Sequence, residues 1–320
     1  MFASGNAERA PTDVFTYLRA RVERPLTRFA PAPTGALHLG HVVNAVYVWG
    51  LAGALGGEVV LRIEDHDRQR ARDEHERDLL DDLDWLGLEP DRYPTSSYRA
   101  GACEGRQSER DAVYREALAP LIAAGRVYGC DCSRAQQATA LLPAAESVAS
   151  DRRYPGTCRE RGIPLSDGVG WRARMDVGIE RFEDAIVGWR EQDPSAQCGD
   201  LLLRDRLGNW TYQCVAAIDD TVQGVTLVVR GQDLLPSTGR QIRLARSIGR
   251  AAPPVFAHHS LVMKSASQKL SKSDRDSGIR DLRAAGWSAD QVIGRAAQLA
   301  GVTGEPRLAA RDLPALFLAK

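Results

Sequence analysis

Between residues 26 and 65 the chain reads as a strand, a tight turn, an apolar helix and a second strand, and this order limits its fold more than any other feature. Residues 26–30 form a short apolar run that ends in a Pro- and Gly-rich turn at 31–35. A mostly apolar helix follows over residues 39–55 and stops at a glycine pair, and residues 58–65 read as a strand that ends in two acids. Strands joined in this way lie parallel, so the sequence predicts an α/β fold with a parallel sheet.

The ends of these two strands are where we expect a ligand. In open parallel sheets, ligands bind beyond the carboxyl ends of the strands. Residues 28–34 and 64–67 occupy these positions. Farther along, residues 201–204, 210–216 and 225–231 continue the strand pattern. We therefore expect both halves of the chain to contribute to one α/β domain with a binding site at its edge.

Composition limits the compartment and the partners that we expect for the protein. Basic and acidic side chains balance at 42 each, so net charge does not indicate a nucleic-acid partner. No run approaches the roughly 18 apolar residues of a membrane span, and residues 1–23 lack the apolar stretch of a signal peptide. Six cysteines in 320 residues are too few for a disulfide scaffold. We expect a cytoplasmic protein with reduced thiols and no membrane partner.

The first candidate motif is His38-Leu39-Gly40-His41, at the junction of the turn and the helix. A helix N-terminus presents unpaired backbone N–H groups and a partial positive charge, which favour phosphate. His38 and His41 are three residues apart and point the same way in a helical turn. Both rings could donate hydrogen bonds as charge develops at phosphorus, and Gly40 leaves room for a flat base. Two surface histidines at a helix start are the alternative.

The second candidate motif is Lys269-Leu270-Ser271-Lys272-Ser273, in a polar stretch far from the first. Its lysines are mobile charges suited to a leaving pyrophosphate, and its serines can hydrogen-bond the same oxygens. Taken alone, such a pentapeptide is usually a solvated loop. As a pair in this order, the two motifs indicate one ATP site assembled from distant parts of the chain.

Together the motifs resemble the "HIGH" and "KMSKS" signatures of class I aminoacyl-tRNA synthetases, with Leu39 and Leu270 replacing Ile and Met. The resemblance implies a Rossmann-type catalytic domain that uses ATP with Mg²⁺. It implies His38, His41 and Lys272 as catalytic residues. The implied ATP-binding residues are His38, Gly40, His41, Lys269, Ser271, Lys272 and Ser273.

Three further segments, 28–35, 62–65 and 230–235, are similar to the glutamyl and glutaminyl branch of these synthetases, and the match runs from Leu26 to Ser273. The branch implies an L-glutamate pocket lined by Arg28, Phe29, Ala30, Pro31, Ala32, Glu64, Tyr212 and Arg230. A dicarboxylate substrate with one ammonium needs a guanidinium and an acid, so we expect Arg28 on the side-chain carboxylate and Glu64 on the ammonium. A structural ion pair at the strand ends is the alternative. The branch often has Ser at the position of Ala32.

A cysteine cluster lies between the motifs, at Cys130, Cys132 and Cys158. Three thiolates and a fourth donor would satisfy tetrahedral zinc, but the spacing alone leaves buried or idle thiols open. The pattern resembles a C-x-C…Y-x-x-x-C zinc site in relatives of this branch, in which a tyrosine is the fourth ligand. That resemblance implies one structural Zn²⁺ held by Cys130, Cys132, Tyr154 and Cys158.

We divide the chain on this basis into an N-terminal extension (1–24), a Rossmann catalytic domain (25–99 and 196–285), an inserted acceptor-binding-like subdomain that carries the zinc site (100–195) and a short helical stub (286–320). The tail after Ser273 has room for two or three short helices, so we expect no anticodon-binding domain. Four arginines near the cysteines are candidates for RNA backbone contacts or for solvated surface: Arg152, Arg153, Arg159 and Arg161.

The short tail together with the cysteine pattern resembles the glutamyl-queuosine tRNA(Asp) synthetases, truncated paralogues of the glutamyl-tRNA synthetases. This resemblance implies activation of L-glutamate to glutamyl-adenylate without tRNA. Transfer of glutamate to the queuosine base at the wobble position of tRNA(Asp) would follow. The alternatives are the catalytic core of an ordinary glutamyl- or glutaminyl-tRNA synthetase and a non-catalytic descendant that binds RNA. We expect a monomer.

Overall fold

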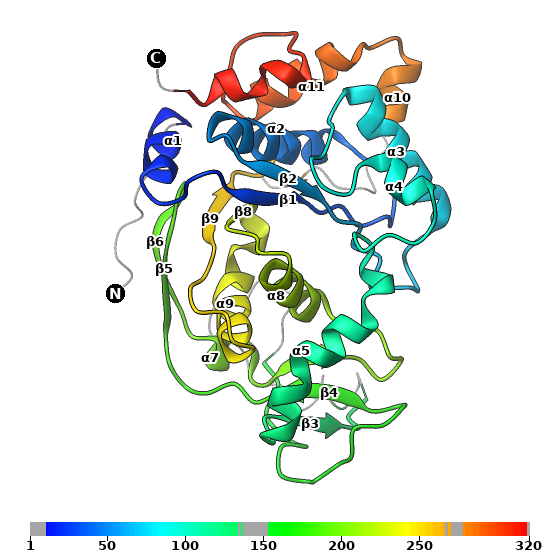
Figure 1. The fold of residues 1–320 in the computed structure, drawn as a ribbon, viewed down its shortest axis with the longest axis vertical. Coiled ribbons are helices and arrows are strands. Elements are labelled where there is room, and N and C mark those ends of the chain that lie inside the picture. Colours follow the sequence, from blue (N-terminus) through cyan, green and yellow to red (C-terminus); the bar gives the residue numbers. More distant parts are fainter. Residues whose placement is uncertain (1–10, 134–135, 137–152, 266–267, 270–277, 319–320) are drawn as a thin grey trace.

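The parallel sheet predicted from the sequence is present. The computed structural model describes residues 11–133, 136, 153–265, 268–269 and 278–318. Strand β1 (Leu26–Phe29) pairs in parallel with β2 (Glu58–Leu61), and helix α2 (Leu39–Ala54) connects them. Because the buried β1 and β2 leave their carboxyl ends on the same side, residues after each strand meet at one edge (Figure 1).

A second parallel pair lies beside the first. Strand β8 (Leu227–Gly231) pairs with β9 (Val255–His259), and helix α9 (Thr238–Ser247) lies between them in the chain. The backbone of Leu26 joins the two pairs, since its carbonyl oxygen accepts from Thr226 N–H at 2.9 Å. Both halves of the chain therefore contribute to one α/β core.

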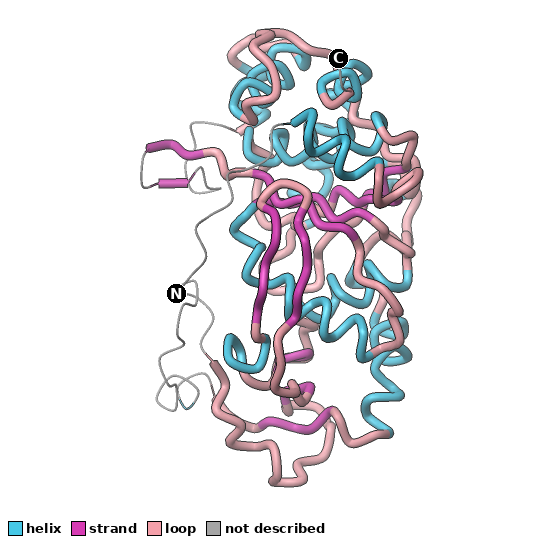
Figure 2. Tube along the Cα trace, turned by 90° about the vertical axis from the view of Figure 1, so that its left-hand side faces the viewer, coloured by secondary structure: helices cyan, strands magenta, loops and turns pink. Residues whose placement is uncertain are grey.

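Two further groups of strands extend this core. Strands β5 (Glu180–Asp184) and β6 (Gly188–Gln192) form an antiparallel hairpin, and β5 also pairs in parallel with β9. Figure 2 shows the two strands of this hairpin side by side, parallel to the long axis of the molecule. Strands β3 (Val127–Cys130), β4 (Gly170–Ala173) and β7 (Leu201–Arg204) form a separate antiparallel sheet. These pairings cross the boundary that the sequence suggested near residue 195, and the division into domains stays a prediction.

Residues 210–216 were expected to continue the strand pattern, and this was wrong. Helix α8 (Tyr212–Val222) begins inside that segment. Seven consecutive residues of this helix, from Cys214 to Asp220, are buried. A helix buried on all sides shows no amphipathic period, and a short apolar run then cannot be distinguished from a buried strand.

Two C-terminal elements, α11 (Ala289–Leu299) and the 3-10 helix η4 (Ala310–Leu316), pack onto α2 (Figure 1). Helix α10 (Ile279–Ala284) precedes them and contacts α11. A Cβ atom at Gly50 of α2 would lie 2.2 Å from the ring of Phe317. A Cβ at Gly53 would lie 2.5 Å from the ring of Pro314. The two glycines thus permit a close approach that a larger residue would prevent.

The remaining elements surround this core. Helix α3 (Asp73–Leu86) ends at Gly87, whose φ of 69° is left-handed. Within the described part of the chain, no helix is long and apolar enough to cross a membrane. The other helices and strands are α1 (Pro11–Arg19), α3 (Asp73–Leu86), α4 (Thr95–Arg99), η1 (Gln107–Glu109), α5 (Asp111–Ala123), α7 (Pro194–Cys198), η2 (Gln232–Ser237), β10 (Met263–Ser265) and β11 (Gln268–Lys269).

Candidate active site

A cavity of about 420 Å³ opens at the carboxyl ends of the parallel strands. Its wall comes from β1, the first turns of α2, the segment after β2, the start of α8, and strands β8 and β9. It is lined by these residues that the sequence suggested: Arg28, Ala30, His38, Gly40, His41, Glu64, Tyr212 and Arg230. The structure therefore brings the first motif and the charged residues at the strand ends into one site.

Three of the predicted pocket residues, Phe29, Pro31 and Ala32, make other contacts and do not line this cavity. The Phe29 ring packs against Trp49 of α2, with 5.2 Å between the ring centroids. The carbonyl oxygen of Pro31 accepts from the N–H of Glu64 at 3.0 Å. Phe29 and Pro31 thus hold the backbone on which the lining residues stand.

The second motif lies almost wholly outside the described residues. Lys269 ends strand β11, of which only the backbone is described. Leu270, Ser271, Lys272 and Ser273 follow in the segment that is not described. The pair β10–β11 that precedes them projects from the body of the molecule (Figure 2). The placement of this motif at the cavity stays a prediction.

The histidine motif forms a capping box at the start of α2. The Nδ1 atom of His38 accepts from the backbone N–H of Gly40 at 3.1 Å. In return, Nδ1 of His41 accepts from the backbone N–H of His38, also at 3.1 Å. A ring nitrogen that accepts carries no proton, so each neutral ring has its proton on Nε2. Both imidazoles therefore present an N–H donor at Nε2, and both line the cavity.

Histidines are unusual as helix caps, which are usually Ser, Thr, Asp or Asn. The two rings lie 3.9 Å apart between centroids. Gly40 separates them, and a Cβ at this position would lie 2.9 Å from the His38 ring. A side chain at this position would therefore push the His38 ring out of its capping position.

Two further cavity residues, Asn44 and His259, were missed in the sequence. Asn44 follows His41 by three residues on α2, and this spacing was a usable signal. Its Oδ1 lies 3.0 Å from Nε2 of His259, whose ring stacks on Tyr47 at 4.9 Å between centroids. The Tyr47 hydroxyl donates to the carbonyl oxygen of Ala300 at 3.1 Å. Through Tyr47, the C-terminal segment supports the wall of the cavity.

Arg28 is held by an acid, Asp220, that no sequence motif indicated. Its Nε donates to Asp220 Oδ1 at 3.1 Å and its Nη1 to the carbonyl oxygen of Val229 at 3.1 Å. Arg62 donates to the same Asp220 oxygen at 2.7 Å. Burial opposes ionisation of Asp220, but the two guanidinium groups outweigh it and lower its pKa. Arg28 thus forms an ion pair with Asp220 of α8, which is a different pair from the one between strand ends considered as the alternative.

Asp219, the neighbour of Asp220, organises a second buried cluster. Its carboxylate accepts from Gln107 Nε2 at 2.8 Å, from Arg110 Nε at 2.7 Å and from the Tyr114 hydroxyl at 3.1 Å. Two adjacent acids inside an apolar helix are rarely buried without partners. The Asp219-Asp220 pair was therefore the available signal for these ion pairs.

Arg230 and Glu64 complete the charged wall. Arg230 donates from Nη1 to Gln241 Oε1 at 2.7 Å and to the Tyr212 hydroxyl at 3.4 Å. Its Nη2 donates to Thr238 Oγ1 at 2.9 Å. Glu64 loses hydration at the cavity wall, which raises its pKa against the opposing effect of nearby positive charges. Asp233 also lines the cavity, so its charged lining residues are two guanidinium groups, from Arg28 and Arg230, and two acids, Glu64 and Asp233. The guanidinium groups suit the carboxylates of a dicarboxylate substrate, and an acid suits its ammonium.

The predicted zinc ligands lie together. The sulfur atoms of Cys130, Cys132 and Cys158 lie within 4.8 Å of one another, and all three residues are buried. The Tyr154 hydroxyl lies 3.5 Å from Cys130 Sγ and 4.0 Å from Cys132 Sγ. Burial opposes a thiolate at Cys130, but hydrogen bonds from Tyr154 and Arg172 outweigh it and lower its pKa. Three thiolates fit Zn²⁺, and the Tyr154 hydroxyl is the additional oxygen beside them, at the position that the resemblance assigns to the fourth ligand.

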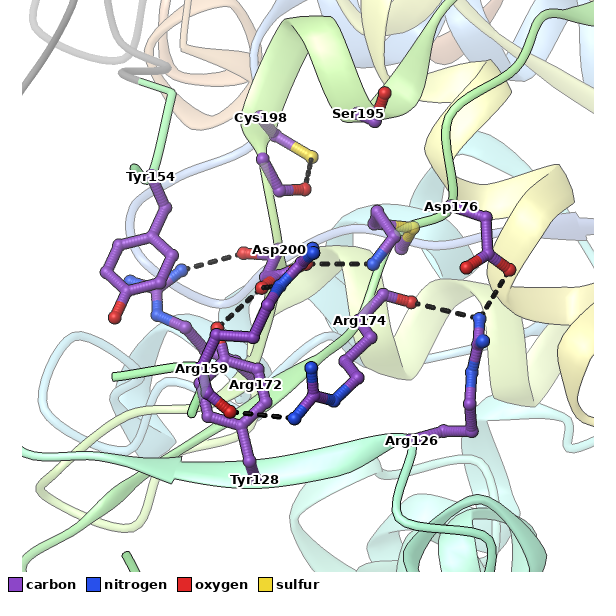
Figure 3. Close-up of polar contacts among 12 residues, drawn as sticks. Arg126, Tyr128, Tyr154, Arg159, Arg172, Arg174, Asp176, Ser195, Cys198 and Asp200 are labelled. Carbon is purple, nitrogen blue, oxygen red and sulfur yellow. Dashed lines mark hydrogen bonds and ion pairs between the residues drawn. The ribbon is translucent and has the colours of Figure 1, made fainter. Parts of the chain in front are cut away.

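A buried aspartate ties this cluster to the rest of the protein. Asp200 accepts from the Tyr128 hydroxyl at 2.6 Å and from Arg159 Nε at 2.7 Å (Figure 3). Its carbonyl oxygen accepts from Arg172, whose guanidinium lies 3.7 Å from the Tyr154 ring centroid. Arg159, a candidate for RNA contacts, is therefore bound to a buried acid.

The other three candidate arginines differ in their surroundings. Arg161 pairs with the exposed Asp131 at 2.6 Å, and Arg153 donates to the carbonyl oxygen of Ser195 at 3.2 Å. Arg152 lies outside the described residues. None of these contacts tests an RNA-binding role for the arginines.

Comparison with known proteins identifies the family of the chain. Residues 25–303 match the family described as tRNA synthetases class I (E and Q), catalytic domain. A glutamyl-Q tRNA(Asp) synthetase of Symbiobacterium thermophilum is 41% identical over 288 residues, 87% of each chain. The enzyme of that name from Rhodobacter capsulatus is 39% identical over 278 residues, 82% of this chain and 96% of its own.

A solved structure shows the same fold. The glutamate tRNA ligase of Elizabethkingia meningosepticum, in complex with its amino acid, superposes with a TM-score of 0.74 at 25% identity. The match covers 93% of this chain and 65% of that ligase, so the chain spans slightly less than two thirds of its length. The chain is thus an enzyme of the class I aminoacyl-tRNA synthetase family for glutamate and glutamine, and within that family it belongs to the glutamyl-Q tRNA(Asp) synthetases.

Proposed function

We propose that the protein activates L-glutamate with ATP in the absence of tRNA and then transfers it to the queuosine base at the wobble position of tRNA(Asp). The observation that carries this proposal is the single cavity that joins a helix N-terminus with two histidines to two buried arginines and an acid. The names of the relatives supply the nucleoside acceptor.

Glutamate would be recognised by its charges. Arg28 has its Nε and Nη1 atoms bonded within the protein, and no hydrogen bond from Nη2 is found among the described residues. This edge suits the side-chain carboxylate of the substrate. Glu64 would neutralise the ammonium, and Tyr212 and Arg230 would orient the amino acid. The ion pair with Asp220 does not compete with this role, because it fixes Arg28 in position before the substrate arrives.

Adenylate formation would occur between the two motifs. An oxygen of the α-carboxylate attacks the α-phosphorus of ATP, and the bond to the pyrophosphate oxygen breaks. The Nε2–H groups of His38 and His41 would donate to phosphate oxygens as their charge grows. Lys269, Ser271, Lys272 and Ser273 would hold the leaving pyrophosphate, and ATP enters as its Mg²⁺ complex. The protein contributes position and charge and forms no covalent bond itself.

Transfer would follow from the same pocket. A hydroxyl of the acceptor attacks the activated carbonyl carbon, an ester bond forms, and AMP leaves with the electrons of the cleaved mixed anhydride.

We also propose the sequence-based domain division and a monomeric state as working hypotheses. Cys130, Cys132, Tyr154 and Cys158 would hold one Zn²⁺ with a structural role. Measurement of bound zinc by mass spectrometry tests this, and less than half an equivalent would count against it.

One labelling experiment tests the proposed function. The protein is incubated with ATP, labelled glutamate and tRNA(Asp) with or without queuosine, and the 3′-terminal adenosine is then removed. We expect label that survives this removal and depends on queuosine. Label lost with the adenosine would indicate an ordinary synthetase, and no label at all would indicate an RNA-binding descendant.

The activation step is tested separately by exchange of pyrophosphate into ATP without tRNA. Lys272→Ala should slow this exchange roughly a hundredfold or more, as removal of one transition-state contact does elsewhere. The fold should stay intact, since Lys272 belongs to a polar stretch. An unchanged exchange rate would contradict the role assigned to the second motif.

A further inference from the structure

A buried aspartate and histidine stand behind Arg230, on the side away from the cavity lining. Asp184 lies at the end of β5 and His258 lies in β9, and both side chains are completely buried. Asp184 Oδ2 lies 2.6 Å from His258 Nδ1, and His258 Nε2 lies 2.9 Å from Arg230 Nε. Neither Asp184 nor His258 lines the cavity, whereas Arg230 does.

The available donors and acceptors fix the direction of the two hydrogen bonds that run from Arg230 through His258 to Asp184. Arginine has no acceptor, so Arg230 Nε–H donates and His258 Nε2 accepts. The proton of the neutral imidazole must then be on Nδ1, where it is donated to Asp184. Burial lowers the pKa of His258 to about 4, and the charge of Arg230 adds to this effect against the opposing Asp184. The ring is therefore neutral near pH 7 and has a single tautomer.

Asp184 is held as an anion by further donors. Its Oδ1 accepts from the backbone N–H groups of Ile186 at 2.9 Å and Val187 at 3.0 Å. Burial opposes its ionisation, but His258 and these two amides outweigh that effect and lower its pKa. Because Oδ1 is fixed by two amides, Oδ2 is the oxygen that faces the His258 ring.

All three guanidinium nitrogen atoms of Arg230 are consequently hydrogen-bonded within the protein. Of its five N–H groups, four are donated within the protein, to His258, Gln241, Tyr212 and Thr238. The Thr238 hydroxyl also lies 3.3 Å from His258 Nε2. Arg230 cannot follow a substrate that binds in another position, because each movement would break bonds between buried groups.

We propose that Asp184 and His258 are positioning residues, which hold the guanidinium of Arg230 in the one orientation that accepts glutamate. This inference rests on the proposed function, in which Arg230 contacts the amino acid. The pair does not touch the substrate and acts only through Arg230. Its expected effect is on the binding of glutamate, with much less effect on the binding of ATP.

Asp184→Asn is the most direct test, since it preserves shape while it exchanges an acceptor for a donor. The amides of Ile186 and Val187 would keep the amide oxygen at the Oδ1 position, so the amide NH₂ would face His258. The imidazole would then accept at Nδ1 and carry its proton on Nε2, where it would oppose the N–H of Arg230. We expect the KM for glutamate in pyrophosphate exchange to rise roughly tenfold to a hundredfold, with the KM for ATP changed less than threefold.

Asp82→Asn is the matched control. Asp82 is another buried aspartate, on α3, and it lies outside the cavity lining. The substitution should leave both KM values unchanged. The ¹⁵N chemical shifts of the His258 ring provide a readout without catalysis: the wild type should show the Nδ1–H tautomer and Asp184→Asn the Nε2–H tautomer.

A second pair of variants keeps the proposal testable if Asp184→Asn does not fold. His258→Gln retains an acceptor that can reach Arg230, whereas His258→Leu has none. We expect His258→Gln to keep the glutamate KM within about fivefold of the wild type and His258→Leu to raise it at least tenfold further.

The outcomes separate this inference from the proposed function. If Arg230→Ala raises the glutamate KM but the Asp184 and His258 variants do not, the positioning role is overturned and the proposed function stands. If Arg230→Ala itself leaves glutamate binding unchanged, the assigned pocket is wrong. Equal rises in the KM values of glutamate and ATP would indicate a general structural defect and would also overturn the positioning role.

Discussion

The two ends of the cavity are built in different ways. At the histidine end, His38 and His41 are fixed by bonds within one helical turn, each to a backbone N–H at 3.1 Å. At the amino-acid end, Arg28 and Arg230 are both buried. Arg28 is hydrogen-bonded to Asp220, 192 positions away in the sequence, and Arg230 to His258, 28 positions away. The histidine end is therefore a local motif, whereas the amino-acid end exists only after β1, α8, β8 and β9 have assembled.

The difference predicts which substitutions affect stability and which affect only chemistry. Groups at the amino-acid end are charged and desolvated, so the loss of one partner leaves an uncompensated buried charge. Groups at the histidine end lie at a helix start, where the cost of a lost cap is only about 0.5–2 kcal/mol. Removal of an acid that pairs with a buried arginine at the amino-acid end should therefore strongly lower the free energy of unfolding, whereas substitutions at the histidine end should mainly slow the chemistry of a folded protein.

The largest effect is expected for Asp220→Ala. It removes the acid that binds both Arg28 and Arg62, which are themselves buried. We expect the free energy of unfolding to fall by about 3–5 kcal/mol, measured by urea denaturation. The control is Asp81→Ala, an exposed partner of Arg99, which should cost less than about 1 kcal/mol. If Asp220→Ala lowers the free energy of unfolding as little as Asp81→Ala does, the proposed difference between the two ends of the cavity is wrong.

The next effect concerns the histidines, where rate and stability should separate. His38→Asn keeps a side-chain acceptor suited to the N-cap but removes the imidazole. We expect pyrophosphate exchange to slow roughly a hundredfold, while the free energy of unfolding changes by less than about 0.5 kcal/mol. His38→Ala should show the same slow exchange together with the loss of the cap. If His38→Asn unfolds as readily as Asp220→Ala, the histidine end is not a local structure.

The smallest effect is a pH dependence at the amino-acid end. Burial raises the pKa of Glu64, so this acid becomes protonated at a higher pH than an exposed glutamate. Protonation removes the charge opposite the substrate ammonium, so the KM for glutamate should rise severalfold as the pH falls through that raised pKa. Glu64→Gln should have a high KM at every pH and lose this dependence. The substrate titrates equally in both proteins, so a persistent dependence in the variant would assign it to the substrate.

Prediction from the sequence succeeded where a residue's surroundings are set by its neighbours in the chain. The apolar run and the glycine stop predicted α2 and its two flanking strands, because such patterns report local geometry. The three cysteines and Tyr154 also lie together, as the family resemblance implied, although their spacing alone had left this open. Residues 210–216 failed because a helix buried all round loses the period that distinguishes it from a strand.

The local patterns of the sequence predicted the parallel βαβ unit and the histidine pair at a helix start, and they supplied the charges suited to glutamate. The pairing of Asp220 with Arg28, and the position of His258 and Asp184 behind Arg230, depend instead on the tertiary structure. It also decided that β5 joins β9 and that Tyr47 links His259 to the C-terminal helices. The difference follows from the separation in sequence of the residues in contact. Helix caps and strand patterns depend on residues a few positions apart, whereas a buried charge must be paired with any group that folding brings close to it.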